Sequence, residues 1–286
     1  MAESEARKLL AKADQKAQHK GWFGSRKFDE AAELYEGAAN QFKVAKCWED
    51  AGKAFLSAAE MYMKLEELDD ASNAYISASK SFKKNNAEAS IDSLKKAIQI
   101  LIQRGRFHSA AGHMKSIALT YETELSDLEN SMSSYEQAAE WYSAEDSNAI
   151  ANGCLLKVAT FAAQLKNYEK AIEIFESIAS ASIDNQMSKW SVKDYFFKAG
   201  LCYFAANDVI GAQKAVERYK QLDSTFSSTR ECKLLSSLID DINNEDIDGF
   251  TNHVAEFDSI SQLDSWKTSL LLAAKNLISV NEDSLT

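Results

Sequence analysis

Three evenly spaced stretches of similar pattern decide the fold of this chain. They read AAELYEGAANQF (residues 31–42), AGKAFLSAAEMY (51–62) and ASNAYISASKSF (71–82). In each stretch a small residue is followed four positions later by an aromatic one and three positions after that by alanine, as in Ala31, Tyr35 and Ala38. Positions i, i+4 and i+7 share one face of an α-helix. The pattern therefore predicts three similar helices, each with one buried stripe.

The same template continues through most of the chain. It recurs at nearly even spacing, with first members at Ser90, Ala110, Ser131, Ala151, Ala171, Val192 and Ala212. A unit of this length leaves about 14 to 16 residues of helix and a short turn, so neighbouring helices must be antiparallel. We expect ten evenly spaced helices, paired into hairpins.

Alternating small and aromatic positions let one hairpin pack against the next, as in tetratricopeptide repeats. The chain has no proline and only 10 glycines, which argues against sheet-rich folds with many tight corners. We therefore expect an all-α, tetratricopeptide-like solenoid of helical hairpins. Such stacks are twisted and curved and present a long concave wall, so holding another protein is their usual function.

The period weakens after about Ser224, although apolar residues keep helical spacing. We expect three or four shorter helices there, bundled as a cap on the solenoid. The net charge of −11 argues against nucleic acid as a partner, although charge is uneven: residues 121–180 and 231–286 each carry −8. The polar segment from Met1 to Lys20 cannot be a secretory signal, and the scattered cysteines fit a reduced, cytoplasmic chain.

No pattern for catalysis is present. The chain has neither a phosphate-binding glycine motif nor G-x-S-x-G, and His108 and His113, its only close histidine pair, are spaced for different helix faces. The cysteines (Cys47, Cys154, Cys202 and Cys232) stand mostly in apolar stretches, which indicates buried structural roles. We expect no catalytic residues, no metal site and no cofactor.

Several blocks along the chain carry a resemblance to a known family. They include Gly21-Trp-Phe-Gly-Ser25, Tyr121-Glu-Thr-Glu-Leu125, Lys193-Asp-Tyr-Phe-Phe-Lys198, Thr229-Arg-Glu-Cys-Lys-Leu234 and Glu256-Phe-Asp-Ser-Ile260. Taken in order, they resemble the soluble NSF-attachment proteins, alpha type, from end to end of the chain. The resemblance implies an adaptor that binds assembled SNARE complexes of syntaxin-type and related helices. It also implies recruitment of the hexameric ATPase NSF and stimulation of its ATP hydrolysis, which disassembles those complexes in vesicle transport.

The resemblance also implies a division of the chain. Residues 1–27 would form a helix and an apolar membrane-contacting loop, residues 28–223 the solenoid, residues 224–279 the helical bundle and residues 280–286 an acidic tail. In the loop, Trp22 and Phe23 match the family's membrane contact, which implies a chain peripheral on membranes. The alternative is that both side chains fold back on the first hairpin.

Basic residues on the concave wall are the implied SNARE-binding residues: Arg106, Lys157, Lys193, Lys198 and Arg230. Gly112 and Gly153 stand where relatives tend to have lysine, and Lys115 compensates in part. Because single exposed ion pairs contribute only about 0.2 to 1 kcal/mol, several pairs and several adaptor copies per complex are expected. For Lys157, which sits between apolar neighbours, the alternative is a lysine extending from a buried helix.

The tail matches the family's ATPase-binding segment through its acidic residues and its penultimate leucine. The residues implied are Glu282, Asp283 and Leu285, with Asp240 and Asp241 adding to the acidic surface. A solvated terminus is the alternative for such a tail. For the chain as a whole, the alternative function is a generic tetratricopeptide-like interaction scaffold unrelated to SNAREs.

Overall fold

The structure is a computed structural model that describes residues 2–18 and 24–283, with only the backbone of residues 24–26 and 279–283. Every regular element within these ranges is helical. The α-helices are α1 (Ala2–Ala17), α2 (Gly24–Val44), α3 (Trp48–Lys64), α4 (Leu68–Phe82), α5 (Ala87–Gln103), α6 (Phe107–Thr120), α7 (Leu128–Ala144), α8 (Asn148–Gln164), α9 (Tyr168–Ser182), α10 (Val192–Ala205), α11 (Val209–Leu222), α12 (Arg230–Asn243), α13 (Ile247–Ile260) and α14 (Ser265–Asp283). The all-α prediction is confirmed.

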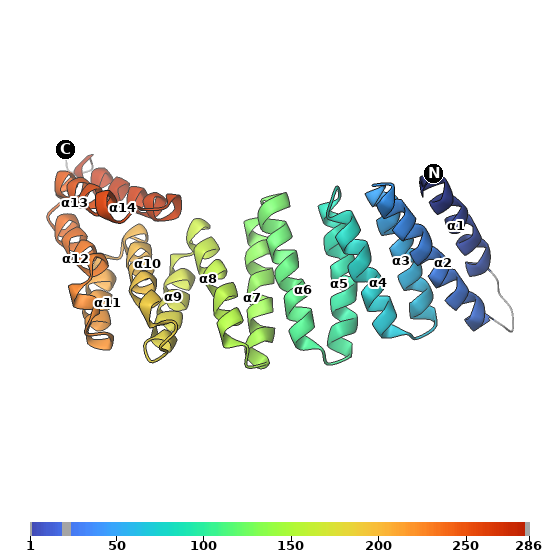
Figure 1. The fold of residues 1–286 in the computed structure, drawn as a ribbon. Coiled ribbons are helices and arrows are strands. Elements are labelled where there is room, and N and C mark those ends of the chain that lie inside the picture. Colours follow the sequence, from blue (N-terminus) through green and yellow to red (C-terminus); the bar gives the residue numbers. More distant parts are fainter. Residues whose placement is uncertain (1, 19–23, 284–286) are drawn as a thin grey trace. The chain divides into compact units, whose positions relative to one another are not determined.

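The chain forms two compact units, residues 1–154 and residues 155–286. In the first unit each helix packs against its neighbours in the sequence, so that α1 to α7 stand side by side (Figure 1). The most extensive contacts are between chain neighbours, which is the arrangement expected of a hairpin solenoid.

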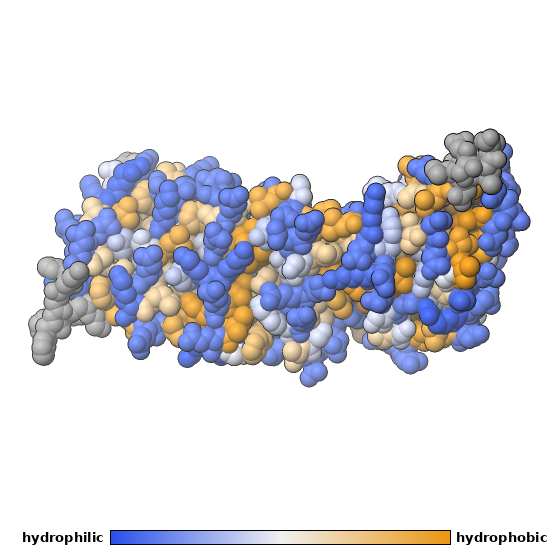
Figure 2. Space-filling model, turned by 180° about the vertical axis from the view of Figure 1, so that it is seen from behind, coloured by the Kyte–Doolittle hydropathy of each residue, from blue (hydrophilic) through white to orange (hydrophobic). Residues whose placement is uncertain are grey.

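The ten predicted stripes fall on α2 to α11, one stripe to each helix. Their members are buried, apart from Met114 and Leu155, which are half-buried. Small residues let the helix axes approach, and aromatic rings such as Tyr35 and Tyr75 fill the space between successive helices. On the face seen in Figure 2, hydrophilic residues cover much of the surface and hydrophobic ones show between them.

Seven of the turns in the described part of the chain share one geometry. Each has a residue with positive φ in the turn: Lys46, Glu66, Gly105, Asp146, Lys166, Asn207 and Glu245. In each turn the next residue donates its N–H to the carbonyl oxygen five positions back, at 2.8 to 3.0 Å. This is the Schellman motif, and the donating residue directly precedes the first residue of the next helix. Proline can occupy neither turn position, because the first needs a positive φ and the second needs its N–H.

The second unit adds the C-terminal bundle of α12, α13 and α14 to the last hairpins. Here α12 packs against α13, and α14 runs crosswise over α10 (Figure 1). The bundle interior includes Leu235, Leu238, Phe250 and Leu271, all buried. The predicted C-terminal helical bundle is therefore confirmed.

A partly buried polar hub joins the hairpins before the bundle. The Glu176 carboxylate on α9 accepts hydrogen bonds from the hydroxyls of Tyr203 on α10 (3.3 Å) and Tyr219 on α11 (2.5 Å), and it pairs with Arg218. Burial, with the nearby carboxylate, raises the pKa of Tyr219. Three successive helices are thus joined at one carboxylate, which keeps α10 in a fixed position beside them.

Candidate functional site

Four cations of the second unit lie on α10, α12 and α14, three of them at the contacts of α10 with the other two helices. They are Lys193, Lys198, Arg230 and Lys267, which we call the basic cluster. Lys193 Nζ lies 3.0 Å from the carboxylate of Glu231, the residue that follows Arg230 in the chain. Sequence reasoning expected three of these four cations, and all three lie in the second unit.

Asp194 organises the other half of the basic cluster. Its two carboxylate oxygens pair with Lys198 Nζ at 2.8 Å and with Lys267 Nζ at 3.1 Å. Burial raises the pKa of Asp194, but hydrogen bonds and charges from both lysines outweigh burial and hold that pKa below its ordinary value. One carboxylate therefore serves two cations, and the cluster keeps a positive excess.

Lys267 was missed by sequence reasoning. Its ammonium group lies over the Phe197 ring at 5.9 Å and 3.7 Å from Asp264, and the side chain is 17% exposed. Its main partner, Asp194, lies 73 positions earlier in the chain, a separation that no local pattern reveals. The only local signal was its place directly after Trp266, a large aromatic residue within the bundle.

The remaining predicted cations lie outside the cluster. Lys157, on α8, is half-buried, and its ammonium group lies over the Phe161 ring at 5.6 Å. In the first unit, Lys115 is exposed on α6, and Arg106 forms an ion pair with Asp69 at 3.4 Å. Arg106 and Lys115 belong to the other compact unit.

The two glycines at expected lysine positions differ in their surroundings. Gly153 is exposed on α8, one turn before Lys157, and an added Cβ would meet no atom within 4 Å. At Gly112 an added Cβ would lie 3.3 Å from the Tyr142 hydroxyl. A side chain is therefore free to enter at Gly153, whereas at Gly112 Tyr142 must shift.

The loop between α9 and α10 exposes two large apolar side chains that sequence reasoning did not single out. Met187 is 94% exposed and Trp190 is 77% exposed, and the Lys189 ammonium group lies over the Trp190 ring at 5.4 Å. Exposed aromatic side chains of this size are enriched at interfaces. The sequence signal that could have found them was a methionine and a tryptophan in the stretch where the helical template is interrupted.

The predicted acidic surface divides into exposed and buried parts. Asp240 is exposed on α12, whereas Asp241 is buried and pairs with His253 Nδ1 at 2.7 Å. Trp22, Phe23 and Leu285 lie outside the described residues, and the side chains of Glu282 and Asp283, at the end of α14, are likewise not described. Those predictions remain predictions.

The thiols have the environment of core residues. Cys154, Cys202 and Cys232 are buried, Cys47 is half-buried, and all four are free. Burial raises the pKa of the Cys202 thiol to about 12 and also raises the pKa values of Cys154 and Cys232. In the described residues, no three His, Cys, Asp or Glu side chains are grouped to hold a metal ion. Likewise, none of the helices described has the length and apolarity needed to cross a bilayer.

Known proteins match the chain over almost its whole length. Residues 4–279 match the family described as "Soluble NSF attachment protein, SNAP". The chain is 48% identical to an alpha-soluble NSF attachment protein of Dictyostelium discoideum, covering 99% of both chains. It is 44% identical to the Mus musculus protein of that name, over 99% of this chain and 98% of the relative. It is 42% identical to a probable vesicular-fusion protein, a sec17 homolog of Schizosaccharomyces pombe, over 97% of this chain and 98% of the relative. With hairpins and bundle both inside the matched range, this chain belongs to the soluble NSF attachment protein family.

Proposed function

We propose that this chain is a non-catalytic adaptor that binds assembled SNARE complexes, recruits the ATPase NSF and stimulates its ATP hydrolysis for SNARE disassembly. The observation that carries the proposal is the family match across residues 4–279, which includes both the hairpins and the bundle. That match does not favour the alternative of a scaffold unrelated to SNAREs. The name of the fission yeast relative associates it with vesicular fusion.

The basic cluster is our proposed centre for SNARE binding in the second unit, with Lys157 as an additional contact. Three of its cations, Lys193, Lys198 and Lys267, are held in position by Asp194 and Glu231, so less side-chain freedom is lost when an acidic helical bundle binds. Because exposed ion pairs weaken as salt screens them, this part of the affinity should fall with ionic strength. In the first unit, Arg106 and Lys115 are proposed to extend the contact.

For the ATPase we propose the acidic side of the bundle and the tail. A basic domain of NSF would meet the exposed Asp240 together with Glu282, Asp283 and Leu285. The bundle, residues 224–279, contains Asp240 and leads into the tail that contains the other three. Asp241 differs from Asp240 because it is buried against His253. In this proposal Asp241 fixes the junction of α12 and α13 and does not contact the ATPase.

Contact with the membrane is proposed for Trp22 and Phe23. Burying one such side chain contributes roughly 1.5 to 3 kcal/mol, too little for stable anchoring by itself. Several copies bound around one SNARE complex would add their weak contacts, which makes the adaptor peripheral on membranes only when it is already docked.

The experiment that tests the adaptor function is binding to an assembled SNARE complex followed by ATP-dependent disassembly with NSF. Lys157→Glu combined with Lys193→Glu should abolish SNARE binding while leaving helicity unchanged. The matched control reverses two exposed lysines of α1, Lys8→Glu with Lys12→Glu, and should bind as the wild type does. Equal binding by both double variants would refute the basic cluster as the SNARE site.

The tail is tested separately. Leu285→Ala should keep SNARE binding and lose ATPase stimulation, because the variant leaves every cation of the basic cluster in place. If Leu285→Ala stimulates NSF as well as the wild type, the assignment of the tail is wrong. If the wild-type chain binds neither partner, the adaptor function itself is wrong.

A further inference from the structure

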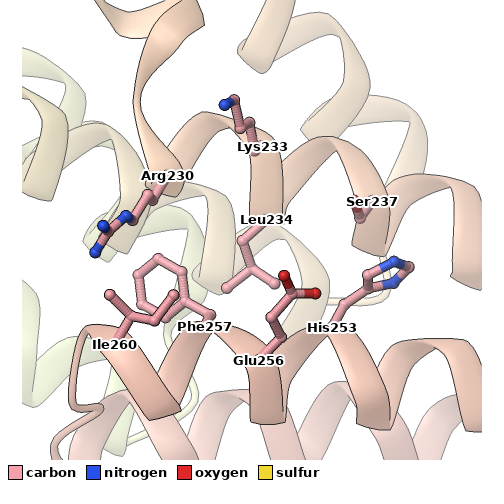
Figure 3. Close-up of a pocket in the computed structure, with 8 residues that line it drawn as sticks. All are labelled: Arg230, Lys233, Leu234, Ser237, His253, Glu256, Phe257 and Ile260. Atoms are coloured by element: carbon pink, nitrogen blue, oxygen red, sulfur yellow. The ribbon is translucent and has the colours of Figure 1, made fainter.

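A cleft of about 410 Å³ opens between α12 and α13 (Figure 3). Its floor is apolar: Leu234 of α12 is buried, and Phe257 and Ile260 extend toward it from α13. Ile260 is nevertheless 58% exposed, an unusual position for an isoleucine beside other apolar side chains. The cleft thus offers apolar surface that this chain leaves uncovered.

Two cations stand on the rim of the cleft. Arg230 and Lys233 are exposed on α12, and neither forms an ion pair with a carboxylate among the described residues. The one polar partner of the Arg230 guanidinium there is the Ser261 hydroxyl, at 3.5 Å. Lys193 and Lys198, in contrast, are paired with carboxylates. The rim therefore presents positive charge that a carboxylate from outside can neutralise.

The third charged group gives the cleft a direction. Glu256 of α13 extends into the cleft on the His253 side, whereas Arg230 and Ile260 lie at the opposite end (Figure 3). A guest carboxylate is attracted at the Arg230 end and repelled near Glu256. An occupant must therefore place its carboxylate toward Arg230 and its apolar side chain against the floor.

We propose that the cleft between α12 and α13 receives one apolar side chain and a neighbouring carboxylate from a helix of the SNARE complex. This inference rests on the proposed adaptor function. A helix that binds in a groove between two other helices is recognised through one or two apolar anchor side chains and through charges that flank them. The anchor contributes by apolar burial, which salt screening does not weaken, so it is separable from the ion pairs of the basic cluster.

The test measures binding of an assembled SNARE complex to the full chain at several salt concentrations. Ile260→Ser should weaken affinity roughly five-fold at every concentration, the scale of losing part of one aliphatic contact. Its dependence on salt should run parallel to that of the wild type. Lys233→Gln should instead weaken binding at low salt and flatten the salt dependence, because it removes a charge.

The matched control is Leu272→Ser on α14, where the leucine is 57% exposed and outside the cleft. This control should bind as the wild type does. Ser237→Trp, which adds bulk on the cleft wall, should weaken binding as Ile260→Ser does. The proposal is overturned if Ile260→Ser and Ser237→Trp bind like Leu272→Ser while the wild type binds. Failure of the wild type to bind would instead overturn the adaptor function, and this inference with it.

Discussion

The indole Nε1–H of Trp266 donates a hydrogen bond to the backbone carbonyl oxygen of Thr160 at 3.1 Å. The bond joins α14 to α8, across 106 positions of the chain. The same indole meets the Phe175 ring edge-on, with centroids 5.8 Å apart. Since α8 also carries Lys157, this contact ties the helix that leads to the tail to a helix of the proposed SNARE site.

Trp266→Ala should destabilise the second unit by about 3 kcal/mol, because it removes a large packed ring and a hydrogen bond. Trp266→Phe, which keeps the ring packing and loses the N–H donor, should cost about 1 kcal/mol. Urea unfolding followed by circular dichroism measures both. The control is Trp190→Ala in the exposed loop, which should change the free energy of unfolding by less than about 0.5 kcal/mol. Equal effects at Trp266 and Trp190 would contradict this account of the Thr160 contact.

The carboxylate of Asp194 should make stability depend on pH. Its pKa is lower in the folded chain than in the unfolded chain, so its stabilising effect is fully present above the unfolded value of about 4. That contribution is lost as the pH falls through the lower folded value. In urea titrations from pH 7 to pH 3, Asp194→Asn should lose less stability on acidification than the wild type. The loop control Asp184→Asn should lose as much stability as the wild type over this range. If Asp194→Asn also loses as much as the wild type, the two-lysine arrangement is wrong.

Glycine should stabilise turns where a residue with a side chain now has positive φ. At Glu66 and Lys166, with φ of 60° and 61°, Glu66→Gly and Lys166→Gly should each raise the free energy of unfolding by about 0.5 to 1 kcal/mol. Glu66→Ala is the control, because alanine keeps the Cβ that disfavours this conformation. Thermal or urea unfolding of the three variants gives the comparison. If Glu66→Ala raises the free energy of unfolding as much as Glu66→Gly does, the gain does not come from relieving the positive φ.

Gly153→Lys should strengthen SNARE binding. Nothing obstructs a Cβ at this exposed position, and the new cation would stand one helical turn from Lys157. One added ion pair should raise affinity about two- to five-fold at low salt, and the gain should shrink as salt rises. Gly153→Ala is the control: it should raise stability by about 1 kcal/mol through helix propensity while leaving affinity unchanged. If the Gly153→Ala and Gly153→Lys variants bind the SNARE complex with equal affinity, position 153 does not face that complex.

The repeat could be predicted because its signal is local. Ala31, Tyr35 and Ala38 are buried together on one helix, so their spacing alone indicates which face of that helix is buried. The turns were harder to predict, since Lys46 and Lys166 adopt positive φ although their residue type gives no sign of it. There the pattern of backbone hydrogen bonds overrides the preference of the residue.

The candidate site was predictable only in part. Lys193, Lys198 and Arg230 were found through a family resemblance, whereas Lys267 enters the cluster through a fold contact with Asp194. Adjacent residues also separate: Asp240 is exposed and Asp241 is buried, because successive helical positions point about 100° apart. Charge composition alone could not tell the two apart.

The burial of the cysteines makes them reporters of local opening. A thiol reacts as the thiolate, and the buried Cys202 is both shielded and protonated at neutral pH. Alkylating reagents should therefore modify the half-buried Cys47 first and reach Cys202 and Cys232 only when α10 or α12 opens. Mass spectrometry of the alkylated chain would follow that opening during a cycle of disassembly, and a SNARE complex that holds the second unit closed should slow alkylation of Cys202.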